Sequence, residues 1–83
     1  MAAQARAQLL AAESRSRQVC VEGANAQREA RRLDTLQARN LASKEAAELG
    51  RTRAEAGQFA CQAARDEAQV ASANVDMNEV LLE

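Results

Sequence analysis

Two cysteines, Cys20 and Cys61, are the residues of this chain best suited to covalent chemistry. If the chain folds back on itself near Asn40, the two cysteines come to the same level, each on the same flank of its own helix. Like flanks face one another in an antiparallel pair, so a disulfide is geometrically possible and would close a loop of about 40 residues. The alternative is a pair of small buried thiols in alanine-sized positions, which a reducing cytosol favours. The sequence alone leaves both possibilities open.

The other residue types give little support for catalysis. The chain has no histidine, which is the usual general base and the commonest transition-metal ligand. It also lacks a glycine-rich phosphate loop and a Cys-x-x-Cys motif. Acidic neighbours such as Glu45 and Glu48, or Asp66 and Glu67, are typical of solvated helix faces. We therefore expect no catalytic residues, no cofactor and no metal site, and we expect that the chain is not an enzyme.

The composition predicts an all-α fold. There is no proline, only three glycines, and a single aromatic residue, Phe59, while alanine is abundant. Such a mixture favours helix and disfavours a sheet. Large apolar side chains are too few for an ordinary globular core, so a compact monomer would be marginally stable. At 83 residues, the chain has room for one small unit, which we expect to need a partner, a second copy or a covalent staple.

Apolar and small residues form a helical stripe that changes face near Asn40. Steps of three and four are the spacing that lines up one side of a helix. On one heptad wheel the second stripe is displaced from the first by roughly 100°. The first stripe comprises Ala2, Ala5, Leu9, Ala12, Ser16, Val19, Gly23, Ala26, Ala30 and Leu33, and the second comprises Ala42, Ala46, Leu49, Ala56, Ala60, Ala63, Val70, Met77 and Leu81.

End and start signals coincide with this change of face. Asparagine tolerates the left-handed conformation that ends many helices, and Leu36 and Leu41 have the spacing of the contact that accompanies such an ending. Ser43 is suited to cap the next helix. The sequence thus predicts one helical unit over residues 1–83, with a helix over 2–38, a turn over 39–42 and a second helix over 43–81. The turn residues are Asn40, Leu41 and Ser43.

The predicted architecture is an antiparallel two-helix hairpin, an alanine-rich coiled coil. The alternative is a single long continuous helix in a coiled coil, with Asn40 as a polar register position. Pairing residues whose numbers sum to 82 places Gly23 opposite Phe59. The helix over 43–81 also carries a further apolar row, which we predict to be an interaction face in a four-helix bundle. That row is Ala47, Ala54, Cys61, Ala68, Val75 and Leu82.

Charge argues against nucleic acid as a partner. Residues 1–42 carry seven arginines against four acidic residues, whereas residues 43–83 carry four basic against eight acidic residues. A near-neutral chain lacks the clustered basic face that nucleic-acid binding requires, and we interpret Arg28, Arg31 and Arg32 as a solvated helix face. No run of apolar residues approaches transmembrane length, and the N-terminus lacks a secretory pattern. We therefore expect an intracellular location by default.

These patterns favour a non-catalytic structural or interaction protein: a helical-hairpin subunit, adaptor or small chaperone that binds a helical protein partner or forms a homo-oligomer. An amphipathic lipid-surface helix is an alternative, although the scarcity of bulky apolar residues makes membrane binding a poor fit. The segment 63–69, with its alanines around Arg65, Asp66 and Glu67, resembles late-embryogenesis-abundant proteins in composition. That resemblance implies a stress-protective helix, but the regular lysine-containing repeat is missing.

Overall fold

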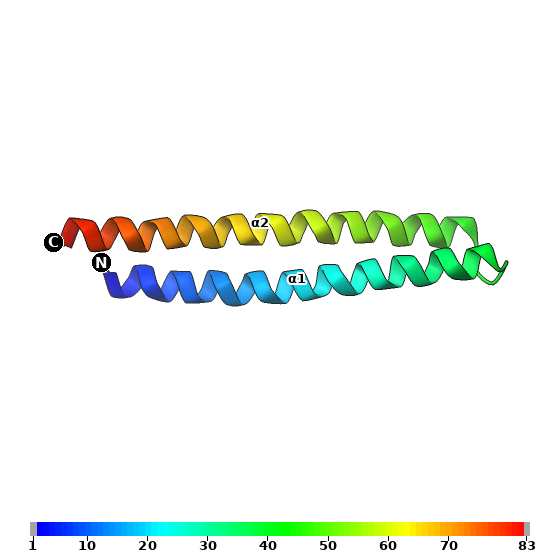
Figure 1. Cartoon of the computed structure of the whole chain (residues 1–83), viewed down its shortest axis with the longest axis horizontal. Coiled ribbons are helices and arrows are strands. Elements are labelled where there is room, and N and C mark those ends of the chain that lie inside the picture. Colours follow the sequence, from blue (N-terminus) through cyan, green and yellow to red (C-terminus); the bar gives the residue numbers. More distant parts are fainter. Residues whose placement is uncertain (1, 83) are drawn as a thin grey trace.

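The protein is an antiparallel hairpin of two long helices. The structure, a computed structural model, describes residues 2–82, with α1 spanning Ala2–Ala38 and α2 spanning Lys44–Leu82. The helices lie side by side along a rod of 65 × 13 × 12 Å, with both termini at one end and the turn at the other (Figure 1). The hairpin prediction is confirmed, and the alternative of one continuous helix is wrong. Assembly into a four-helix bundle remains a prediction.

Backbone and side-chain hydrogen bonds hold the turn between the two helices, with Asn40 and Ser43 in the roles expected from the sequence. Asn40 has a φ of 60°, the left-handed conformation that asparagine tolerates. The Leu41 N–H donates to the Leu36 carbonyl at 2.8 Å and the Asn40 N–H to the Gln37 carbonyl at 2.9 Å, which is the Schellman pattern. Ser43 Oγ then accepts a hydrogen bond from the Ala46 N–H at 3.0 Å and caps α2, which therefore begins at Lys44, one residue later than predicted.

The seam between the helices is described most simply in heptads, with positions a and d in the contact, e and g beside it, and b, c and f pointing outward. On α1 the seam is the first predicted stripe, from Ala2 to Leu33, and every member is buried or partly buried. On α2 the residues with the same pattern of burial are not the second predicted stripe. They are Ala47, Gly50, Ala54, Gly57, Cys61, Ala64, Ala68, Ala71, Val75 and Asn78.

The helices come closest at Gly23 and Gly57. A Cβ placed on Gly23 would lie 2.8 Å from the Gly57 carbonyl oxygen, and one on Gly57 would lie 3.0 Å from the Gly23 Cα. Backbone therefore packs directly on backbone at this level, which only glycine allows. The predicted pairing of Gly23 with Phe59 is wrong, because the Phe59 side chain is 65% exposed and the close approach occurs two residues earlier.

Ion pairs join the two helices toward both ends of the rod. Arg6 Nη2 lies 2.6 Å from Glu79 Oε1 near the termini, and Arg51 Nη2 lies 2.8 Å from Asp34 Oδ1 near the turn. All four residues occupy e positions, so both pairs lie on the same side of the seam. Because their side chains are largely solvated, the pairs contribute little stability and mainly favour this register.

Candidate interaction surface

A second apolar face of α2 remains exposed after the hairpin has formed. It runs along the c and f positions in steps of three and four, and all its members are exposed. We call this set the free face. It consists of Leu49, Thr52, Ala56, Phe59, Ala63, Asp66, Val70, Ala73, Met77 and Val80.

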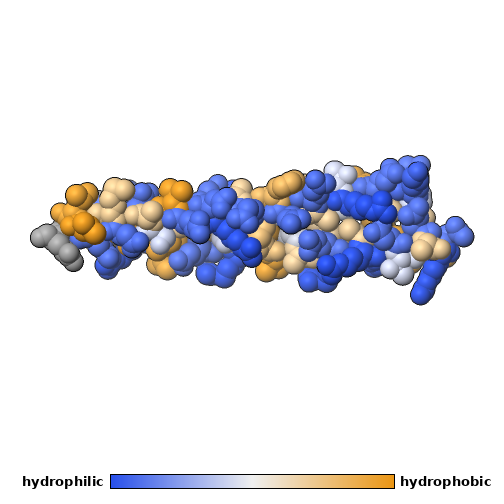
Figure 2. Space-filling view, turned by 45° about the horizontal axis from the view of Figure 1, so that its top comes forward, coloured by the Kyte–Doolittle hydropathy of each residue, from blue (hydrophilic) through white to orange (hydrophobic). Residues whose placement is uncertain are grey.

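The free face of α2 carries several large apolar side chains, whereas the seam of α2 consists mostly of small residues. Phe59 is 65% exposed, Val70 62% and Met77 59%, whereas the buried seam positions Ala47 and Ala64 carry single methyl groups. In a space-filling view, apolar surface is prominent at the end that carries the termini, and smaller patches occur along the rod (Figure 2). An apolar stripe along a helix normally faces another structural element, so its exposure marks a candidate contact surface.

A shallow apolar groove continues the free face at the turn end. Its volume is about 190 Å³. Leu49 belongs both to the groove and to the free face, and Glu29 and Arg53 are the charged residues of the groove's lining. A hydrogen bond from Arg32, together with its positive charge, lowers the pKa of the Glu29 carboxyl below its usual value. The groove is lined by Ala26, Glu29, Leu33, Ala46, Leu49, Gly50 and Arg53.

The interaction face predicted from the sequence lies instead in the seam. Ala47 is fully buried, Val75 is 8% exposed, and Ala54, Cys61 and Ala68 are partly buried, so this row packs against α1 and is not available to a partner. The side chain of Leu82 lies outside the described residues. This row, and not the second predicted stripe, meets α1 because its side chains are small. Small residues let two helices approach closely, whereas bulky ones hold them apart.

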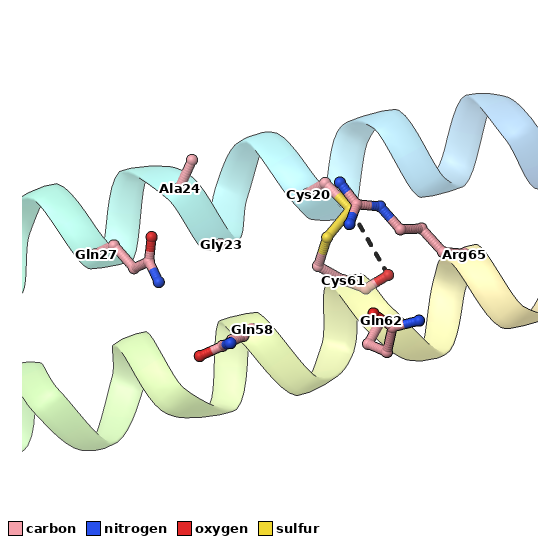
Figure 3. A pocket seen from close by; sticks show the side chains of 8 residues that line it. All are labelled: Cys20, Gly23, Ala24, Gln27, Gln58, Cys61, Gln62 and Arg65. Carbon is pink, nitrogen blue, oxygen red and sulfur yellow. Dashed lines mark hydrogen bonds between the residues drawn. A yellow bond between two sulfur atoms is a disulfide. The ribbon is translucent and has the colours of Figure 1, made fainter.

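Cys20 and Cys61 are joined by a disulfide across the seam, with their Cα atoms 4.5 Å apart. The bridge lies beside an open groove, and Arg65 extends toward it from α2 (Figure 3). Cys20 Sγ also lies 3.6 Å from the Cys61 carbonyl oxygen. A bonded sulfur has no proton to donate, so this contact could become a hydrogen bond only in the reduced chain. The disulfide fixes the register close to the Gly23–Gly57 contact.

Polar groups elsewhere are arranged as solvated helix faces. Arg28 donates a hydrogen bond to Asn25, and Arg32 pairs with Glu29 at 2.6 Å, each within α1. Within the described residues, no group of three or more histidine, cysteine or acidic side chains is placed to hold a metal ion. Neither described helix is long and apolar enough to cross a membrane. The free face is thus the most distinctive surface of the hairpin.

Comparisons with protein-family models, with curated proteins and with solved structures find no match to this chain.

Proposed function

We propose that this chain is a non-catalytic structural or interaction protein that binds a partner helix along the free face of α2. The observation that carries the proposal is the line of exposed apolar side chains from Leu49 to Val80. In an isolated hairpin these side chains would remain in water, at a cost of roughly 25 cal/mol for each Å² left exposed. A helix packed on the free face would remove much of that surface from water.

The shape of the free face favours a helical partner. Its steps of three and four over about nine turns match the ridges and grooves of another helix. A globular partner would contact only part of such a long, narrow line. The hairpin itself is stiffened by the disulfide and by backbone contact at Gly23, so it presents the line with little loss of conformational freedom on binding.

Site-specific photo-cross-linking tests this proposal. A photoreactive residue replaces Val70, which lies on the free face, or Ser72, an exposed e position of α2 beside the seam. In the cells that make the protein, the probe at position 70 is expected to give a discrete adduct and the probe at position 72 none. Equal labelling from both positions, or no discrete adduct from position 70, would overturn the proposal.

A further inference from the structure

The outward-facing charges of the hairpin are sorted by helix. At the b, c and f positions, α1 carries arginines and no acidic residue, whereas α2 carries acidic residues and no arginine or lysine. All of these side chains are exposed. The arginines are Arg17, Arg28, Arg31 and Arg32, and the acidic residues are Glu45, Glu48, Glu55, Asp66 and Asp76.

The charges beside the seam are not sorted in this way, because both helices carry basic and acidic residues there. The e positions supply both interhelical ion pairs, Arg6 with Glu79 and Asp34 with Arg51. Formation of the hairpin therefore does not use the sorted charges on the outer surfaces. Two copies meeting α2 to α2 would bring acidic residues together, and α1 to α1 would bring arginines together, whereas α2 to α1 would bring opposite charges together.

We propose that the free face of α2 is covered by the outer face of α1 from a second copy of this chain. This outer face is the line of b and f positions, which also runs in steps of three and four. Its residues are Ala3, Ala7, Leu10, Ser14, Arg17, Val21, Ala24, Arg28, Arg31 and Thr35. The inference rests on the proposed function, because it names the partner helix that the free face binds.

An antiparallel register with Asp66 opposite Arg17 makes the two faces complementary in charge and in size. Asp66 is the one charged residue of the free face, and Arg17 would neutralise it. Large side chains then lie opposite small ones along the contact, which is how a close helix pair fills its volume. The pairs are Phe59 with Ala24, Ala63 with Val21, Val70 with Ser14, Ala73 with Leu10, Met77 with Ala7 and Val80 with Ala3. At the turn end, Glu55 comes level with Arg28.

Such a contact is heterologous, since it joins two different surfaces of identical chains. Each copy would offer its free face to one neighbour and its α1 outer face to another. The antiparallel register keeps all turns at the same end and the copies nearly level. Growth would stop only where a ring closes, so the average mass should rise with concentration beyond that of a dimer.

Two charged substitutions disrupt the two proposed contact surfaces one at a time. Phe59→Lys places a positive charge on the free face and opposite an arginine-bearing helix, and Leu10→Glu places a negative charge on the outer face of α1. Both residues are 65% exposed, so the hairpin should fold normally, which circular dichroism can verify. Ser72→Lys is the matched control, because it introduces the same charge at an exposed e position of α2 that lies off the free face.

Sedimentation equilibrium of the intact, oxidised chain measures the mass of each variant in solution. The wild type and Ser72→Lys should both increase in mass with concentration, while Phe59→Lys alone and Leu10→Glu alone should remain at 8.9 kDa. An equimolar mixture of Phe59→Lys and Leu10→Glu should form a species of twice that mass, because one intact contact remains between them. Association of Leu10→Glu with itself would overturn the inference in favour of a symmetric α2–α2 contact.

Failure of this inference is distinguishable from failure of the proposed function. A wild-type chain that stays monomeric at every soluble concentration overturns the second-copy assignment. If the probe at position 70 then yields an adduct with a protein of another mass, the free face still binds a helix and the proposed function stands. If that probe yields no discrete adduct either, both proposals fall.

Discussion

Gly23 and Gly57 lie so close across the hairpin that a Cβ on Gly23 would be 2.8 Å from the Gly57 carbonyl oxygen. This contact explains which face of α2 meets α1. Helices can touch backbone to backbone only where both present small residues, and the row that contains Gly57 meets that requirement. The bulky residues of α2 are consequently left on the free face.

Substitution of Gly23 by alanine should destabilise the hairpin. The added methyl group meets backbone, so the helices must separate. We expect Gly23→Ala to lower the free energy of unfolding by about 1–2 kcal/mol, since overpacking costs about 1–3 kcal/mol and the better helix propensity of alanine returns at most about 1 kcal/mol.

Gly50→Ala is the matched control for that substitution. There the added methyl group would meet Leu33 Cδ1 at 2.8 Å, the end of a flexible side chain that can move aside. We expect a neutral effect or a gain of up to about 1 kcal/mol. Chemical denaturation followed by circular dichroism ranks the two variants, and a Gly23→Ala chain as stable as Gly50→Ala would contradict backbone contact at Gly23.

Reduction of the Cys20–Cys61 disulfide should lower the stability of the hairpin markedly. In the chain-entropy treatment, a loop of about 40 residues is worth roughly 3–4 kcal/mol. Denaturation with and without a reductant measures this difference. The double variant Cys20→Ser, Cys61→Ser should match the reduced chain and be insensitive to the reductant. Two titratable thiols in the native chain under oxidising conditions would show that the bridge does not form.

Asn40 should tolerate glycine better than alanine. Its φ of 60° lies in the left-handed region, which costs other residues about 1–2 kcal/mol and costs glycine little. Asn40→Ala is therefore expected to lower the unfolding free energy by about 1 kcal/mol, and Asn40→Gly to leave it unchanged or slightly raised. Equal stabilities of the two variants would mean that residue 40 does not adopt the left-handed conformation.

The pKa of the Glu29 carboxyl should lie below the usual value for glutamate. Arg32 lowers its pKa by hydrogen bonding to it and by its positive charge, so Glu29 stays ionised to lower pH in the folded chain. The associated stabilisation is present above the ordinary glutamate pKa and is lost as the pH falls through the lowered value. Carbon-detected NMR titration measures the pKa of the Glu29 carboxyl. Arg32→Gln should raise this pKa toward its usual range. No response to that substitution would exclude Arg32 as the cause.

The sequence predicted the hairpin and its turn well, because those signals are local. The turn residues from Asn40 to Ser43 act through hydrogen bonds to residues three to five positions away. On α1, the outer line of b and f positions is interrupted by arginines, so it competes only weakly with the predicted stripe. The orientation of α2 was predicted wrongly because α2 has two apolar faces, and periodicity cannot say which one meets α1. The glycine and alanine row containing Gly57 was the available signal, since only small residues allow close approach.

Cys61 could also have settled the orientation of α2. A bond to Cys20 requires Cys61 to lie in the seam, yet the sequence interpretation placed it on the partner-binding row. The exposed positions Phe59, Ala73 and Val80 were missed as members of a surface, because they belong neither to the second predicted stripe nor to the predicted interaction row. Pairing of helix faces depends on contacts between distant residues, which a single sequence does not display.

Ala63 and Ala64 provide the most direct test of the claim that α2 keeps one face for α1 and another for a partner helix. They are adjacent alanines, but Ala63 is exposed on the free face and Ala64 is 4% exposed in the seam. Lysine at position 63 should leave the unfolding free energy within about 0.5 kcal/mol of wild type and abolish the adduct from the probe at position 70. Lysine at position 64 should destabilise the hairpin by several kcal/mol, because it buries an unpaired charge. Thermal unfolding and cross-linking of the two variants decide the matter, and the reverse pattern, or undiminished cross-linking of Ala63→Lys, would contradict the account.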